Sequence, residues 1–232
     1  MSSLDGGDAL RPESQLLLSE IIDYDYEYSC DMYPAAADSS SMLLGRRAVW
    51  LEGDSLAPPC QADAESVGSI LDFLQSFISE KDIVYDLGCG DGRIPIAAAY
   101  RFGCKAVGIE IEDRLADIFR TYLARIQESG TLSLCEATFN GSNRSVYDLV
   151  SVRSEDLLTS DISDATIIVV YLLPESIELI RAVLISCLSR GGVVVCNTWG
   201  ARGLHCTERR QCGNLTLLKY TKDSLIVADC EA

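Results

Sequence analysis

Basic residues are scarce in this chain of 232 residues. Lys and Arg total 19 against 35 Asp and Glu, which gives a formal net charge of −16 at pH 7. A protein that binds the phosphates of a nucleic acid needs a basic surface, so this balance argues against a nucleic-acid substrate. The same excess of acidic groups favours basic partners, including lysine-rich proteins.

The sequence also lacks a secretory signal and any apolar run long enough to cross a membrane. Its ten cysteines are scattered without paired spacing, and we expect them to be reduced thiols of a cytoplasmic protein. His205, Cys206 and Cys212 have the wrong spacing for a zinc ribbon and no evident fourth ligand. No metal site is therefore expected.

Composition divides the chain into a tail and a domain. Residues 1–44 hold nine Asp and Glu against one Arg, which predicts a disordered or weakly ordered tail over residues 1–48, or alternatively an acidic recognition arm. Such a tail is a poor mitochondrial presequence, because those are rich in Arg. Residues 49–232 are expected to form one domain, in which the polar segment 129–147 is a surface insertion or, alternatively, a substrate-selecting loop.

A ligand cradle is predicted between residues 83 and 99. A β-rich run over 83–86 meets a turn that contains Gly88, Gly90 and Gly92, and apolar and small residues then continue at helical density over 93–102. Glycine allows positive φ and close approach of a ligand, and the N-terminus of the following helix offers free N–H groups to an anion.

Two carboxylates narrow the choice of ligand. Asp86 stands immediately before the loop, where it repels a pyrophosphate but can accept a hydrogen bond from an ammonium group. A second β-like run, over 106–110, ends in Glu110, where a Rossmann-type fold places a carboxylate on ribose hydroxyls. The spacing is G-x-G-x-G, and Arg93 stands where a dinucleotide loop has its third glycine. The pattern predicts an adenosine-containing ligand with an amino-acid end.

The stretch Asp-Leu-Gly-Cys-Gly-Asp-Gly from Asp86, with Glu110 ending the next strand, resembles motif I and the acidic strand-2 residue of class I S-adenosylmethionine-dependent methyltransferases. With Arg93-Ile and a downstream Tyr-Leu-Leu-Pro-Glu segment, the chain is similar to a small group that includes the lysine methyltransferases of the adenine nucleotide translocase and of the ATP synthase c subunit. The resemblance covers roughly residues 56–200. It implies S-adenosylmethionine as cofactor, bound by Asp86, Gly88, Gly90, Gly92 and Glu110.

The resemblance further implies a Rossmann-like α/β fold with a seven-stranded, mostly parallel sheet, a C-terminal antiparallel hairpin and helices on both faces. The sequence predicts helices over 64–79, 93–102, 113–128 and 174–190 and strands over 83–86, 106–110, 149–153, 166–172 and 192–199. The hairpin is predicted over 214–220 and 225–230. Pro58 and Pro59 are candidates for a segment that covers the cofactor, or simply part of a surface turn.

Further site residues are expected at strand ends. In the family an acidic residue after the third strand accepts the adenine amino group, and Asp156 matches that position best, with Glu155 second. Tyr171 and Glu175 follow the fourth strand and are candidates for orienting an acceptor amine, or a core tyrosine and a helix N-terminal glutamate. The segment lacks the (Asn/Asp)-Pro-Pro-aromatic motif of nucleic-acid amino methyltransferases.

The predicted function is transfer of a methyl group to a protein lysine. The alternatives are a small-molecule methyltransferase and a protein that binds S-adenosylmethionine without turnover.

Overall fold

The computed structural model describes residues 62–130, 145–213 and 215–229. The predictions for the tail over residues 1–48, for Pro58 and Pro59 and for most of the 129–147 segment lie outside these ranges. None of the helices within the described ranges has the length and apolar character needed to cross a membrane.

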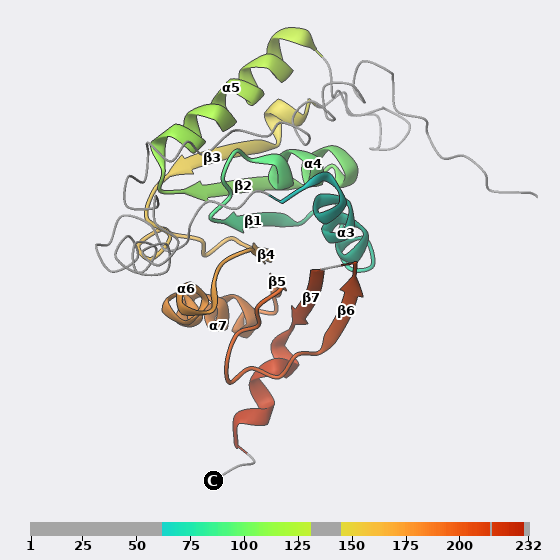
Figure 1. Ribbon diagram of the computed structural model, residues 1–232, viewed down its shortest axis with the longest axis vertical. Helices are drawn as coiled ribbons and strands as arrows, with labels where there is room; N and C mark the ends of the chain where they lie inside the picture. The colour runs from blue at the N-terminus through green and yellow to red at the C-terminus, as the bar shows by residue number, and fades with distance from the viewer. Residues whose placement is uncertain (1–61, 131–144, 214, 230–232) are drawn as a thin grey trace, which may run out of the picture.

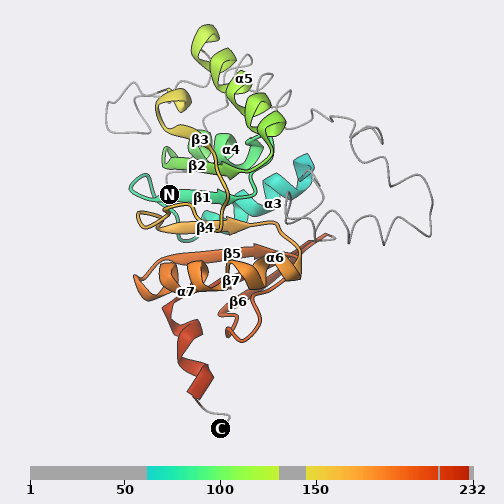
Figure 2. The ribbon, with the colours of Figure 1, turned by 90° about the vertical axis from the view of Figure 1, so that its left-hand side faces the viewer.

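A seven-stranded sheet forms the centre of the domain (Figures 1 and 2). The strand order is β3-β2-β1-β4-β5-β7-β6, and β7 runs antiparallel to both of its neighbours. The chain starts in the middle, builds outward through β3 and then returns to the other side of β1, which creates a switch point between β1 and β4. The strands are β1 (Ile83–Leu87), β2 (Lys105–Glu110), β3 (Val150–Ser154), β4 (Ile167–Val170), β5 (Val193–Asn197), β6 (Glu208–Cys212) and β7 (Leu215–Tyr220). The predicted fold class is confirmed.

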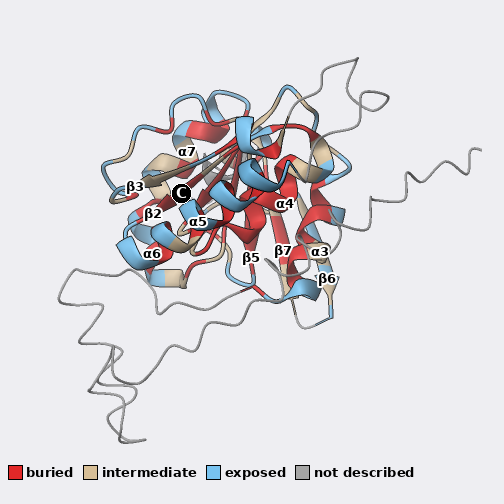
Figure 3. Cartoon of the chain, turned by 90° about the horizontal axis from the view of Figure 1, so that it is seen from above, coloured by how far each residue is buried: buried red, intermediate tan, exposed pale blue. Residues whose placement is uncertain are grey.

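Helices cover both faces of the sheet. Buried side chains of α3 (Ala64–Leu74), α4 (Arg93–Phe102) and α5 (Asp113–Ser129) belong to the core on one face. Those of α6 (Pro174–Leu179) and α7 (Arg181–Ser189) belong to the core on the other. Two 3-10 helices, η3 (Val146–Asp148) and η4 (Lys222–Asp229), complete the described elements. Figure 3 shows buried residues concentrated in the strands and on the inward sides of the helices.

Local sequence explains where the helices start and which side they bury. Asp63 caps α3, since its carboxylate accepts the backbone N–H of Ser66 at 2.8 Å. On α5 four buried apolar residues recur at helical spacing, so this helix lies on the sheet along one stripe. These residues are Leu115, Phe119, Tyr122 and Ile126, and Ile118 beside them is half-buried.

The predicted C-terminal hairpin pairs the wrong segments, because β7 pairs with β6, which precedes it, and not with the segment that follows it. The turn follows β6 at Gly213, and the predicted second strand over 225–230 is instead part of η4 as far as residue 229. The sequence did not predict β6, because Glu208 to Arg210 is a charged run. β6 is an edge strand in which only every second residue is exposed. Gly213 has a φ of +55°, which suits a two-residue hairpin turn.

Two helices are shorter than predicted. The helix expected over 64–79 ends at Leu74, although Phe77 and Ile78 still pack against the core from the turn that follows. Because the apolar pattern continues through this turn, it does not mark the end of the helix. The helix expected over 174–190 is divided in two at Ile180, where φ is −89° and ψ is 2°.

Gly92 and Gly191 offer a matched test of loop packing. Both have positive φ, +83° and +90°, but a Cβ at Gly92 would overlap the Phe119 ring, whereas a Cβ at Gly191 would meet open space. We expect Gly191→Ala to lower the free energy of unfolding by about 1–2 kcal/mol through backbone strain. Gly92→Ala should lower it by roughly 2–5 kcal/mol, because overpacking is added. Urea unfolding measures both, and equal losses would show that the ring yields without cost.

Candidate functional site

The carboxyl ends of β1 and β4 lie side by side at the switch point of the sheet, where open α/β folds bind ligands. The glycine loop follows β1, Glu110 ends β2, and Tyr171 follows β4. The fold therefore brings the predicted residues of the first, second and fourth strands to one end of the sheet.

Asp86 is a buried carboxyl group that has no partner among the described residues. It is 2% exposed, and no hydrogen bond from the described residues reaches its side chain. Burial, with additional repulsion from Glu110 and Asp91, raises the pKa of Asp86 to about 8. A cation brought next to this group would restore its ionised form, so the site suits an ammonium group.

Glu110 is held by the backbone instead. The N–H of Gly90 donates to Oε2 at 2.8 Å, and the N–H of Glu112 donates to Oε1 at 2.9 Å. Burial raises the pKa of the Glu110 carboxyl, and these backbone hydrogen bonds partly oppose that shift. A carboxylate has about four acceptor positions, so the group keeps capacity to accept from hydroxyl groups such as those of a ribose.

The three loop glycines serve different purposes. All have positive φ, +79° at Gly88, +57° at Gly90 and +83° at Gly92. A Cβ at Gly88 would come within 2.9 Å of the Leu172 side chain. Gly90 turns its N–H to Glu110. Gly92 is buried against Phe119, so its lack of a side chain serves packing of the loop on α5.

An ion pair that sequence reasoning missed locks the loop in place. Arg93 and Asp91 are both buried, with Nη2 of Arg93 2.7 Å from Oδ2 of Asp91. Nη1 of Arg93 also donates to the carbonyl oxygen of Ala62 at 2.7 Å. The arginine that replaces the third glycine therefore joins the start of α4 to the chain just before α3. The only feature of the sequence that could have indicated this ion pair is the closeness of the two residues in the Asp-Gly-Arg triplet.

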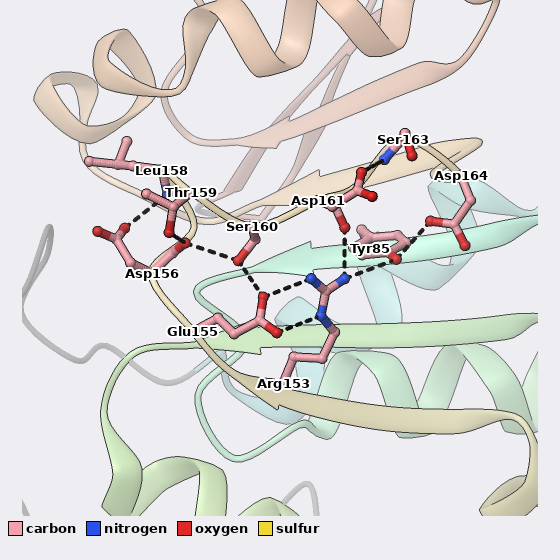
Figure 4. A network of polar contacts seen from close by, with 10 residues as sticks. All are labelled: Tyr85, Arg153, Glu155, Asp156, Leu158, Thr159, Ser160, Asp161, Ser163 and Asp164. Atoms are coloured by element: carbon pink, nitrogen blue, oxygen red, sulfur yellow. Dashed lines mark hydrogen bonds and ion pairs between the residues drawn. The ribbon is translucent and has the colours of Figure 1, made fainter.

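The two acidic residues after β3 have different surroundings (Figure 4). Arg153 binds both oxygens of Glu155, from Nη2 at 2.7 Å and from Nε at 3.1 Å, and it holds the pKa of this carboxyl below its usual value. Asp156 accepts the N–H of Leu158 on Oδ1 at 2.9 Å. No described residue donates to its Oδ2, which leaves Asp156 the better placed acceptor.

Arg153 also fixes the connection from β3 to β4, which runs over residues 155–166 without a regular helix. It donates to the carbonyl oxygen of Asp161 at 2.7 Å. Close by, the Tyr85 hydroxyl donates to Oδ1 of Asp164 at 2.8 Å. Figure 4 shows these side chains between β1, β3 and the loop. The contacts tie the loop to the sheet and thereby position Asp156.

Tyr171 and Glu175, both predicted to orient the acceptor amine, have different surroundings. Tyr171 is half-buried and packs against the core on the same face as Val84 and Val169. Asp86 shares this face, because it alternates with Tyr85 and Leu87 of the opposite core. Glu175 lies exposed in the first turn of α6. A buried polar residue on the Tyr171 side, Asn197 at the end of β5, was not anticipated from the sequence.

Comparison with known proteins gives one curated relative and many structures. No family model matches the chain. A protein-lysine N-methyltransferase of Saccharolobus islandicus (strain REY15A) is 37% identical over 127 residues, which is 54% of this chain and 68% of that protein. The structure of an RNA methyltransferase from Salinibacter ruber, in complex with S-adenosyl-L-homocysteine, is 32% identical over 71% of this chain and 93% of the other, with a TM-score of 0.56.

A precorrin-6y C5,15-methyltransferase from Geobacter metallireducens GS-15 shares the fold at 12% identity, with a TM-score of 0.50 over 73% of this chain and 94% of the other. The relative at 37% identity is matched over 68% of its length, and the structure at 32% identity over 93% of its length. The chain belongs to the class I S-adenosylmethionine-dependent methyltransferases.

Proposed function

We propose that this methyltransferase acts on the ε-amine of a lysine in a basic protein. The observation that carries the proposal is the 37% identity to a relative named as a protein-lysine N-methyltransferase. The net charge of −16 supports it, because an acidic protein attracts basic partners. We also propose a cytoplasmic location, supported by the free thiols of all six described cysteines.

The residues after β4 suit an aliphatic amine. Tyr171 is followed by buried Leu172, half-buried Leu173 and Pro174. Lysine has a reference pKa of about 10.4, and an apolar channel lowers the pKa of an amine by disfavouring its charged form. Such a channel therefore supplies the neutral amine that methyl transfer requires, without a dedicated general base.

The cofactor, when bound, supplies a methyl group already activated on a sulfonium sulfur. Under our proposal ionised Asp86 accepts a hydrogen bond from the cofactor ammonium, Glu110 accepts from the ribose hydroxyls and Asp156 accepts from the adenine amino group. Tyr171 orients the amine in line with the methyl carbon. With the cofactor bound, its methyl carbon would pass from sulfur to the nitrogen lone pair of the neutral amine, and the methylated ammonium product would release a proton to water. The contribution of the chain is positioning in a dry site.

RNA is the competing acceptor. The Salinibacter ruber relative is named as an RNA methyltransferase at 32% identity. The acidic balance of this chain disfavours phosphate binding. The Tyr-Leu-Leu-Pro segment also lacks the Asn or Asp that begins the (Asn/Asp)-Pro-Pro-aromatic motif of the nucleic-acid amino methyltransferases. Fractionation of the reaction products separates these two acceptors.

The direct test is transfer of a labelled methyl group from S-adenosylmethionine into a hypomethylated cell lysate. We expect label in protein that hydrolyses to methyl-lysine, and at least about a hundredfold less label with Asp86→Ala, because loss of the buried carboxylate removes the ammonium acceptor. Products are separated into protein, nucleic acid and small molecules. Label only in RNA or only in small molecules would reject the lysine acceptor, and full activity of Asp86→Ala would reject the assigned cofactor site.

Cofactor binding should release a proton through Asp86. With a pKa of about 8, the carboxyl is mostly protonated at pH 7, whereas an adjacent ammonium lowers the pKa and favours the ionised form. We expect most of one proton to leave per S-adenosylhomocysteine bound at pH 7, and affinity to rise with pH up to about 8. Calorimetry in buffers of different ionisation enthalpy measures this release. An enthalpy independent of buffer in the wild type, or unchanged proton release in Asp86→Asn, would contradict the assignment.

The acidic residues after β3 give a matched pair of variants. Asp156→Asn replaces one of the two accepting oxygens with an N–H donor, so the side chain can no longer accept from both Leu158 and adenine, whereas Glu155→Gln alters a group already engaged by Arg153. We expect S-adenosylhomocysteine to bind about 5- to 20-fold more weakly to Asp156→Asn and within about twofold of the wild type to Glu155→Gln. Fluorescence or calorimetric titration provides both constants. The reverse order of effects would move the adenine contact to Glu155.

A further inference from the structure

Asn197 carries a buried donor that the fold leaves unused. The residue is 0% exposed, and its side-chain Nδ2 has no hydrogen-bond partner in the part of the chain that the structure describes. Its Oδ1 accepts a hydrogen bond from the hydroxyl of Thr198 at 3.1 Å. A buried amide donor without a partner lowers the stability of the folded state. We therefore looked for a ligand that this side chain could bind.

The sheet places Asn197 beside the acceptor end of the site. The residue ends β5 and alternates with Val195, which belongs to the same core as Val84 and Val169. Val170 pairs with Cys196, so the next residues along the two parallel strands, Tyr171 and Asn197, lie opposite each other. Neighbouring strands are about 5 Å apart. Asp86, Tyr171 and Asn197 therefore mark one face at the carboxyl ends of β1, β4 and β5.

The backbone immediately after Asn197 is strained. Thr198 has a φ of +66°, and it is the one residue other than glycine with positive φ among those described. A β-branched side chain rarely adopts this conformation. Two short backbone hydrogen bonds hold this conformation. The Thr198 N–H donates to the carbonyl oxygen of Thr216 and the Trp199 N–H to the carbonyl oxygen of Asn197, both at 2.7 Å. Strain of this kind concentrates at functional sites, where surrounding contacts fix a side chain for use.

We propose that the Asn197 side-chain amide is a hydrogen-bond partner of the acceptor amine. The inference rests on the proposed amine acceptor and adds a residue to that site. The Thr198 hydroxyl both donates and accepts, so a half-turn of the amide preserves its contact with Thr198 and presents Oδ1 to the ligand. Oδ1 then accepts an N–H of the amine and helps direct the nitrogen lone pair toward the methyl carbon.

Asn197→Leu removes the amide at nearly constant volume, and Cys196→Ala is the control on the same strand. Cys196 is equally buried but belongs to the core of the opposite face. The probe is sinefungin, a cofactor analogue in which an amine-bearing carbon replaces the sulfonium and its methyl group. Its amine enters the acceptor site without any acceptor protein. S-adenosylhomocysteine lacks that amine and reports on the cofactor site alone.

We expect Asn197→Leu to bind S-adenosylhomocysteine within about twofold of the wild type and sinefungin at least about tenfold more weakly. Its Tm should equal or exceed that of the wild type, because an unpaired buried donor is removed. Methyl transfer should fall by at least about tenfold through kcat. Cys196→Ala should leave the ratio of the two affinities unchanged.

Two results would overturn the proposal. In one, sinefungin binds Asn197→Leu as tightly as it binds the wild type. In the other, both ligands and the Tm fall together, which would assign Asn197 a structural role. Because the sinefungin measurement uses no acceptor protein, its result does not depend on the outcome of the lysate experiment. Failure to label lysine would reject the proposed substrate and leave the Asn197 result intact.

Discussion

Three buried carboxyl groups around one glycine loop are the constraint that shapes this protein. Asp86, Asp91 and Glu110 are all buried at the end of the sheet, where like charges repel one another and desolvation disfavours each. The fold treats them differently. Asp91 is neutralised by Arg93, Glu110 is bound by two backbone N–H groups, and Asp86 has neither. The group left without a balancing contact is the one that we propose binds the cofactor ammonium.

The rest of the structure keeps this arrangement rigid. Phe119 of α5 fills the space that a side chain at Gly92 would need, and Cys89 takes the corresponding space at Gly108 of β2. The loop is thus packed between a helix and a strand rather than lying open. Arg93 adds a link to Ala62 ahead of α3. A ligand entering here meets preformed groups, which lowers the entropic cost of binding.

The parts that sequence predicted are those encoded by neighbouring residues. The glycine turn, the preceding Asp86 and the strand ending in Glu110 are local patterns, and the structure brings them to one end of the sheet. The hairpin prediction named the wrong partner strand for two reasons. The true partner, β6, is a charged edge strand, and Leu225 belongs to η4 rather than to a strand. Arg93 and Asn197 were missed because their roles depend on partners distant in sequence, or on the lack of one.

One of the two edge strands of the described sheet, β6, has a consequence for association between molecules. β6 ends the strand order and carries Glu208, Arg209 and Arg210 in succession. Arg210 lies over the Phe73 ring, 4.7 Å from its centre, and contacts Glu208 at 3.2 Å. An open edge invites pairing with a strand of another chain, and adjacent charges with long side chains oppose it. At this edge the protein guards against aggregation through sheet extension.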